Sequence, residues 1–246
     1  MTAAAFYRPA TGRLEVLGTF PSRPSLLDRG QSDAVGDAYV RMQGRGELSV
    51  PGDATVPVAP WLVELMKQVE GETIATITAD RYKQAELGEA VDKAGIRAPA
   101  IWRAQGFRAG GEDCERFRRA AYDGKVRTAP SLLLRSAFAD AVCLRDPANN
   151  LKLAKARSTG RIDAVAATVL AVFLGTGANG QPLGVITGAA PFSRLLKNSE
   201  STRSCHPKAE KPSVIGWSFQ FDGMKWPHAG RFFLPNDSKR PFSAAC

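Results

Sequence analysis

The stretch that decides the fold is Glu72-Thr-Ile-Ala-Thr-Ile-Thr-Ala-Asp80. Residues 73–79 are short, apolar and rich in β-branched side chains, which is typical of a buried strand. A helix is expected to follow over 83–94, because Gly95 stands where helices commonly end. A strand that leads directly into a helix predicts an α/β domain. Asp80 then lies at the strand end, where such folds usually place functional groups.

Further elements of both kinds surround this strand. Residues 2–7 and 13–20 predict a hairpin joined by the turn Pro9-Ala-Thr-Gly12. Ser131 is a suitable N-cap for one of the expected helices. Strands are also predicted at 99–104 and 125–128, and helices at 34–42, 60–69, 112–123, 132–144 and 161–174.

The amino-acid composition of the chain changes near residue 175. The remaining residues are rich in Gly, Pro, Ser and Lys, with clustered aromatic side chains and little periodicity. We therefore predict one domain over 1–174 and an irregular C-terminal extension over 175–246, to which the sequence assigns no role.

The charge of the chain points to a polyanionic partner. Its 246 residues carry a formal net charge of +9, with a sequence pI near 9.7. Lys and Arg displace condensed counterions from phosphate backbones, so nucleic acid is the favoured partner. An anionic membrane surface is the alternative.

The cysteines and histidines are few, and their positions argue against several classes of site. The four cysteines form no CxxC pair, which argues against a zinc ribbon or a disulfide scaffold and fits a reducing cytoplasm. Both histidines, His206 and His228, lie near the C-terminus, so carboxylates must perform any metal chemistry in the main domain. The start does not resemble a signal peptide, and the longest apolar run, 164–174, is too short to span a bilayer. We expect no membrane association.

Asp163 is the second candidate carboxylate. It lies in the first turn of an apolar helix, where the helix dipole favours an ionised side chain that can bind a hard cation. Two carboxylates that meet at a strand end are what a two-metal nuclease requires. Taken singly, Asp80 is more often a turn residue and Asp163 more often a partner of the helix dipole.

A basic group precedes Asp163 closely, and such side chains would contact phosphates without reading base sequence. A solvated charged face is the alternative. The group comprises Lys152, Lys155, Arg157 and Arg161, and a second group comprises Arg116, Arg118, Arg119, Lys125 and Arg127.

Six short motifs follow one another along the chain: Ala79-Asp-Arg-Tyr-Lys-Gln-Ala-Glu86, Ile101-Trp-Arg-Ala-Gln-Gly106, Gly111-Glu-Asp113, Ala129-Pro-Ser-Leu-Leu-Leu-Arg-Ser136, Asp146-Pro-Ala-Asn-Asn-Leu-Lys-Leu-Ala-Lys155 and Gly160-Arg-Ile-Asp163. In this order they resemble the C-terminal nuclease domain of phage and prophage large terminase subunits. The resemblance covers roughly residues 1–174. It implies an RNase H-like mixed sheet flanked by helices, and a site for two Mg²⁺ or Mn²⁺ ions with three or more acidic residues. Asp80 would follow the fourth core strand, and Asp163 would lie on the closing helix.

The chain departs from the family pattern at the first core strand. That strand carries the family's first carboxylate in a motif resembling Gly-Leu-Asp-Leu-Gly, which is absent here. The opening, Met1–Glu15, resembles the family's second strand and hairpin, so we expect an N-terminally truncated domain with two exposed strand edges. Four other acidic residues could replace the missing carboxylate, but each is better interpreted as solvated surface: Asp33, Asp37, Glu112 and Asp113. Of these, Asp113 is the one to test.

The sequence therefore predicts a metal-dependent endonuclease that cuts double-stranded DNA during viral genome packaging in a bacterial host. No Walker A motif for a packaging motor occurs in the chain. By the resemblance, the small terminase subunit and the portal protein are expected partners. The alternatives are a catalytically inactive DNA-binding or packaging remnant, and another RNase H-like enzyme such as a resolvase or transposase.

Overall fold

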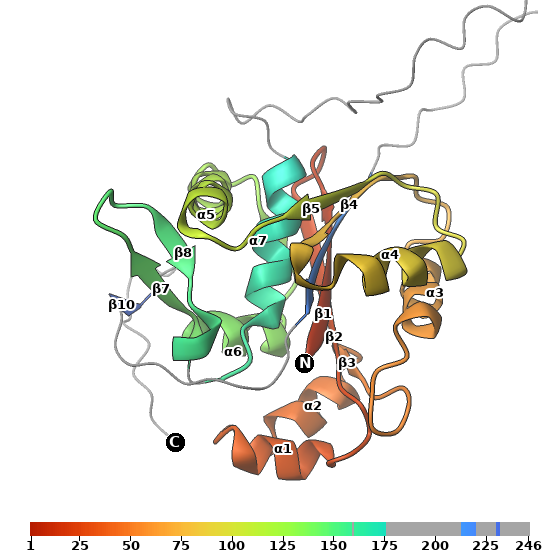
Figure 1. The fold of residues 1–246 in the computed structure, drawn as a ribbon. Coiled ribbons are helices and arrows are strands. Elements are labelled where there is room, and N and C mark those ends of the chain that lie inside the picture. The colour runs from red at the N-terminus through yellow and green to blue at the C-terminus, as the bar shows by residue number, and fades with distance from the viewer. Residues whose placement is uncertain (159, 176–212, 220–229, 232–246) are drawn as a thin grey trace, which may run out of the picture.

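The computed structural model describes residues 1–158, 160–175, 213–219 and 230–231 (Figure 1). Helices are α1 (Leu26–Ser32), α2 (Ala38–Gly44), α3 (Val58–Gln68), α4 (Gln84–Lys93), α5 (Phe107–Tyr122), α6 (Leu132–Asp140) and α7 (Asp163–Gly175), with short 3₁₀ turns η1 (Arg81–Lys83) and η2 (Lys155–Arg157). Strands are β1 (Thr2–Arg8), β2 (Arg13–Thr19), β3 (Leu48–Ser49), β4 (Ile74–Asp80), β5 (Ala100–Arg103), β6 (Arg127–Thr128), β7 (Val142–Arg145), β8 (Leu151–Leu153), β9 (Ser213–Phe219) and β10 (Gly230–Arg231).

A seven-stranded mixed sheet forms the centre of the fold, with the order β3-β2-β1-β9-β4-β5 and β6 paired to β2. The strand β9 runs antiparallel to β1 and parallel to β4. It therefore joins the β1 half of the sheet to the β4 half by backbone hydrogen bonds. A second sheet, with the order β10-β7-β8, contains three strands.

Strand β1 lies inside the fold, because helices cover both of its faces. Ala3, Ala4 and Ala5 are each fully buried. Ala3 and Ala5 belong to the cluster that contains α5, α6 and α7, whereas Ala4 belongs to the cluster that contains α3 and α4. Successive side chains of a strand point to opposite faces, so these clusters define the two layers of helices that enclose the sheet. Figure 1 shows α7 lying along β1 and β9, with α4 on the other side of the sheet.

The hairpin turn is formed at Gly12, which has φ +71°. A Cβ at this position would lie 2.5 Å from the carbonyl oxygen of Lys125. The turn thus needs glycine for its backbone conformation and for the close approach of the chain leading to β6.

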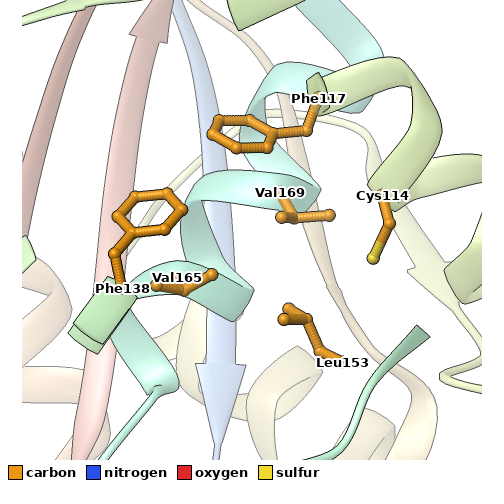
Figure 2. Close-up of a pocket in the computed structure, with 6 residues that line it drawn as sticks. All are labelled: Cys114, Phe117, Phe138, Leu153, Val165 and Val169. Carbon is orange, nitrogen blue, oxygen red and sulfur yellow. The ribbon is translucent and has the colours of Figure 1, made fainter. Parts of the chain in front are cut away.

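A small apolar cavity of about 10 Å³ lies between α5, α6, β8 and α7 (Figure 2). Its volume is close to that of a single water, but its lining offers no polar partner of the kind that holds buried water. It is lined by Cys114, Phe117, Phe138, Leu153, Val165 and Val169. The rings of Phe117 and Phe138 stack above it with centroids 5.7 Å apart.

Most elements expected from the sequence are confirmed, including the hairpin, the strand that ends at Asp80 and the helix that begins near Asp163. Other expectations need correction. Residues 26–44 hold two helices, α1 and α2, where one was expected at 34–42, and α5 begins at Phe107 and not at residue 112. Helix α6 ends at Asp140, because residues 142–145 pair with β8. Residues 151–157, which carry Lys152, Lys155 and Arg157 of the basic group before Asp163, were not expected to hold regular structure and form β8 and η2. Residues 213–219, expected to be irregular, form β9 and fill the gap between β1 and β4, so these two strands are not exposed edges.

The cavity lining gives a test of the core. Phe117→Ala removes a side chain that is 1% exposed and should lower the free energy of unfolding by about 3–5 kcal/mol in urea titrations. Tyr122→Ala, at a 60% exposed position of the same helix, is the control and should cost less than about 1 kcal/mol. Equal losses for the two variants would contradict the packing described for α5.

Candidate nuclease site

Asp80 ends β4 on the side of the sheet that α7 covers. Ile77 and Ala79 pack into the cluster with α3 and α4, so Thr78 and Asp80 belong to the opposite face. The Oδ1 atom of Asp80 accepts a hydrogen bond of 3.1 Å from the backbone N–H of Tyr82. Asp80 therefore caps η1 while its half-buried carboxylate stays on the face toward α7.

Asp163 begins α7 and is fully buried. Its Oδ1 atom lies 3.4 Å from the Nζ atom of Lys155, whose side chain is 17% exposed. A buried carboxylate is costly unless it is paired, so this contact and the helix N-terminus both stabilise the Asp163 side chain where it lies. The sequence analysis named Asp163 and Lys155 as candidate residues but did not show that they form an ion pair.

The start of α7 lies at the end of the sheet where β4 finishes. Arg161 Nε donates to Asp33 Oδ2 at 2.8 Å, and the hydroxyl of Tyr39 donates to the same carboxylate at 2.8 Å. The ring of Tyr39 lies 5.0 Å from that of Phe20, which directly follows β2. Thr19, the last residue of β2, pairs with Thr2 at the start of β1, and β4 runs antiparallel to the direction of β1. The end of β2 therefore lies at the same end of the sheet as the end of β4. The contacts from Phe20 through Tyr39 and Asp33 to Arg161 place the N-terminus of α7 toward this end.

Arg103 extends from the neighbouring strand along α7. It pairs in register with Asp80, yet its guanidinium carbon lies 4.1 Å from the ring centroid of Phe173 near the end of α7. The same guanidinium donates to Asp113 Oδ1 at 2.7 Å. Asp80 therefore lies on the sheet face that α7 covers and Asp163 lies at the start of α7, while Arg103 links β5 to α5 and to the far part of α7.

Asp113 and Asp33 are not the solvated surface residues that were expected. Asp113 is 2% exposed, and burial raises the pKa of its carboxyl group even though Arg103 acts in the opposite direction. Asp33 has a side chain that is 14% exposed and holds Arg161. Asp37 and Glu112 do lie at the surface, with side chains 62% and 53% exposed. Asp113 therefore serves an ion pair between β5 and α5.

Strand β4 and helix α7, which carry Asp80 and Asp163, each have one buried hydroxyl group. These are Thr78 Oγ1 and Thr168 Oγ1, and neither has a hydrogen-bond partner among the described residues. Buried hydroxyls are usually satisfied by protein or by ordered water. Thr78 shares its sheet face with Asp80.

Two ligands are fewer than a two-metal site needs. Within the described ranges, no three His, Cys, Asp or Glu side chains gather closely enough to hold a metal ion. The hard oxygen ligands Asp80 and Asp163 fit a divalent cation, but the described residues do not complete its site, and Lys155 already compensates one of the two charges.

The basic residues before Asp163 divide into two kinds. Lys155 and Arg161 are engaged by Asp163 and Asp33. Lys152 has its ammonium group 4.2 Å from the ring centroid of Phe107, and Arg157 ends η2 with partial exposure. Lys152 and Lys155 both line a cleft of about 30 Å³ between the start of α5, β8 and α7. The cleft therefore opens beside the ammonium group that neutralises Asp163.

The mixed sheet and its two helical layers make this an α/β domain. Residues 69–176 match the family model described as the endonuclease domain of the terminase large subunit. This segment is therefore similar to the nuclease domain of phage large terminases, as the ordered motifs predicted. No helix in the described part of the chain has the length and apolar character to cross a membrane.

Relatives of this chain come from bacteriophage HK97. The large terminase subunit of that phage is 26% identical over 149 residues, which cover 60% of this chain and 29% of the relative. The crystal structure of the HK97 large terminase superposes with a TM-score of 0.59 at 22% identity, over 70% of this chain and 39% of the crystallised one. The chain thus spans about 29–39% of the length of the relatives it matches, and the structural likeness establishes the fold.

The ion pair at the start of α7 gives a second test. Lys155→Met leaves Asp163 buried without this cation and should lower the free energy of unfolding by about 3 kcal/mol at pH 7. Lys152→Met removes an ammonium group that lies over an aromatic ring, and should cost about 0.5–1 kcal/mol.

Urea titrations of both variants measure the difference. The double variant Lys155→Met/Asp163→Asn should recover part of the loss, because it also removes the buried charge. A Lys155→Met protein as stable as Lys152→Met would show that the pair does not support α7.

Proposed function

We propose that this chain is the nuclease part of a viral large terminase and cuts double-stranded DNA with the help of Mg²⁺ or Mn²⁺. The observation that supports the proposal is the match of residues 69–176 to the terminase endonuclease domain, a segment that contains Asp80 on the sheet face covered by α7 and Asp163 at the start of α7. Carboxylates from separate elements at a strand end are the usual means of holding divalent cations for phosphodiester cleavage.

A divalent cation bound there would supply Lewis acidity, activating a water and neutralising charge on the leaving oxygen. The residues of the chain provide its environment. Asp163 is buried at the start of α7 beside Lys155, and Asp80 is held by its cap on η1. Lys155 is the counter-charge of Asp163, a role that a bound cation would share.

The four basic residues before Asp163 would position the DNA backbone to different degrees. Lys152 and Arg157 are the stronger candidates for phosphate contacts, since Arg161 is held between Asp33 and the start of α7. Phosphate contacts from such residues would orient a duplex without selecting its sequence. As part of a longer terminase, the domain would work with a small terminase subunit and a portal protein in the cytoplasm of the bacterial host.

The proposed chemistry is tested by conservative changes of the two carboxylates. Asp80→Asn and Asp163→Asn should each reduce Mn²⁺-dependent nicking of supercoiled plasmid by at least about a hundredfold, because even outer partners of metal sites contribute about 10–100-fold. Asp92→Asn, at an exposed position of α4, is the matched control and should keep the parent activity. Circular dichroism checks that all three variants fold.

Full activity in either carboxylate variant would remove that residue from the site. An inactive parent chain that still binds DNA would favour the packaging remnant. Preferential cleavage of branched DNA would favour a resolvase-like enzyme.

Electrostatic binding gives a separate test. The affinity for double-stranded DNA should fall steeply with salt, and Lys152→Ala or Arg157→Ala should each reduce the slope of log K against log [salt] by about 1. Fluorescence anisotropy with duplexes of two unrelated sequences measures this. Lys93→Ala, which removes an ammonium group paired with Glu89 on α4, should leave the slope unchanged. A flat salt dependence of the parent protein would contradict phosphate-based binding.

A further inference from the structure

One ion pair ties the start of α7 to a distant part of the chain. Asp33 follows α1, and Arg161 lies two residues before the first residue of α7. The Nε atom of Arg161 donates to Asp33 Oδ2 at 2.8 Å, and its Nη2 atom donates to Asp33 Oδ1 at 3.2 Å. The two side chains are 18% and 14% exposed. Such a bidentate pair fixes both the position and the orientation of the guanidinium.

The carboxylate of Asp33 is itself held in place. The hydroxyl of Tyr39, a buried residue that packs against Phe20, donates to Asp33 Oδ2 at 2.8 Å. Burial and then the hydrogen bond to Asp33 raise the pKa of Tyr39, so its hydroxyl remains a donor. A Cβ at Gly30 of α1 would lie 1.9 Å from the carbonyl oxygen of Gly36, so the turn after α1 closes tightly and needs glycine there. The fold of this segment therefore fixes the carboxylate.

Asp163 lies within reach of the same guanidinium. Two residues along a chain span at most about 7 Å, which an arginine side chain can bridge. Between them, Ile162 is fully buried, and its carbonyl oxygen accepts a hydrogen bond of 3.0 Å from the backbone N–H of Ala166. The carboxylate of Asp163 faces the ammonium group of Lys155 at 3.4 Å. Two positive side chains, Lys155 and Arg161, are thus near enough to serve as its counter-charge.

We propose that Asp33 is a positioning residue of the cation site, which keeps the Arg161 guanidinium away from Asp163. Arginine stays charged and pairs readily with carboxylates, and a buried carboxylate is stabilised by pairing. Without Asp33, Arg161 would become a second counter-charge of Asp163 beside Lys155. A divalent cation would then compete with two positive side chains instead of one. The inference rests on the proposed function, because it takes Asp163 to be a cation ligand.

The charge count separates this role from simple support of the fold. Asp33 and Arg161 together carry no net charge. Asp33→Asn leaves an extra positive charge near the start of α7, whereas Arg161→Gln leaves an extra negative charge. Both variants break the same ion pair, yet they should change the affinity for a divalent cation in opposite directions. A pair that only supports the fold would make both variants fail in the same way.

The first experiment measures Mn²⁺ binding to the full chain by isothermal titration calorimetry. Asp33→Asn should weaken binding by roughly tenfold, because a unit charge acts strongly on a divalent cation in a partly buried site. Arg161→Gln should bind at least as tightly as the parent, and so should the double variant Asp33→Asn/Arg161→Gln. Asp37→Asn is the matched control from the same segment, with a side chain that is 62% exposed, and should leave the affinity unchanged.

The second experiment needs no metal ion. Urea titrations measure how far Lys155→Met lowers the unfolding midpoint in three backgrounds. In the parent the loss should be large, because Asp163 loses its counter-charge. In Asp33→Asn the loss should be at most about half as large, because Arg161 can replace the ammonium group. In Asp33→Asn/Arg161→Gln the full loss should return.

Two results would overturn the inference. If Asp33→Asn and Arg161→Gln weaken Mn²⁺ binding equally, the ion pair only supports the fold. If Lys155→Met costs as much in Asp33→Asn as in the parent, the released guanidinium does not reach Asp163. A parent that binds no Mn²⁺ would count against the proposed function, and the urea titrations would still decide whether Asp33 keeps Arg161 away from Asp163.

Discussion

The structure depends on the backbone pairing of β9 with β1 on one side and with β4 on the other. Through β9, the hairpin half of the sheet is joined to the half that carries Asp80. The inner strands β1 and β4 would otherwise present unpaired N–H and C=O groups inside a buried layer, at a cost comparable to many lost hydrogen bonds. Helix α7 packs over the same three strands, so the position of Asp163 depends on this pairing too.

The buried ion pair of Lys155 and Asp163 connects stability with the proposed chemistry. A carboxylate that is fully buried is retained at a cost that apolar packing alone would avoid. Its position in the first turn of α7, beside a lysine that lines an open cleft, gives that cost a functional explanation. Under the proposed function, a bound divalent cation would take over from the Lys155 ammonium group as the counter-charge of Asp163.

Local signals in the sequence predicted much of this fold. The β-branched run before Asp80, the N-cap at Ser131 and the apolar run after Asp163 each specify an element through short-range preferences, and each element is present. The family resemblance was confirmed by the match of residues 69–176. The role of β9 was missed, although residues 213–219 are apolar and include β-branched and aromatic side chains, because long-range strand pairing leaves no local mark. For the same reason, sequence reasoning treated Asp33 and Asp113 as surface residues, whereas their partners Arg161 and Arg103 are supplied by tertiary structure.

The central claim is that Asp80 and Asp163 share one bound cation. Anomalous diffraction from Mn²⁺-soaked crystals tests it most directly. The account predicts a manganese peak at the end of β4 and the start of α7, within coordination distance of both carboxylates or of one carboxylate and a water held by the other. A protein that binds manganese only elsewhere, or crystals in which the two carboxylates lie on opposite sides of the sheet, would contradict it.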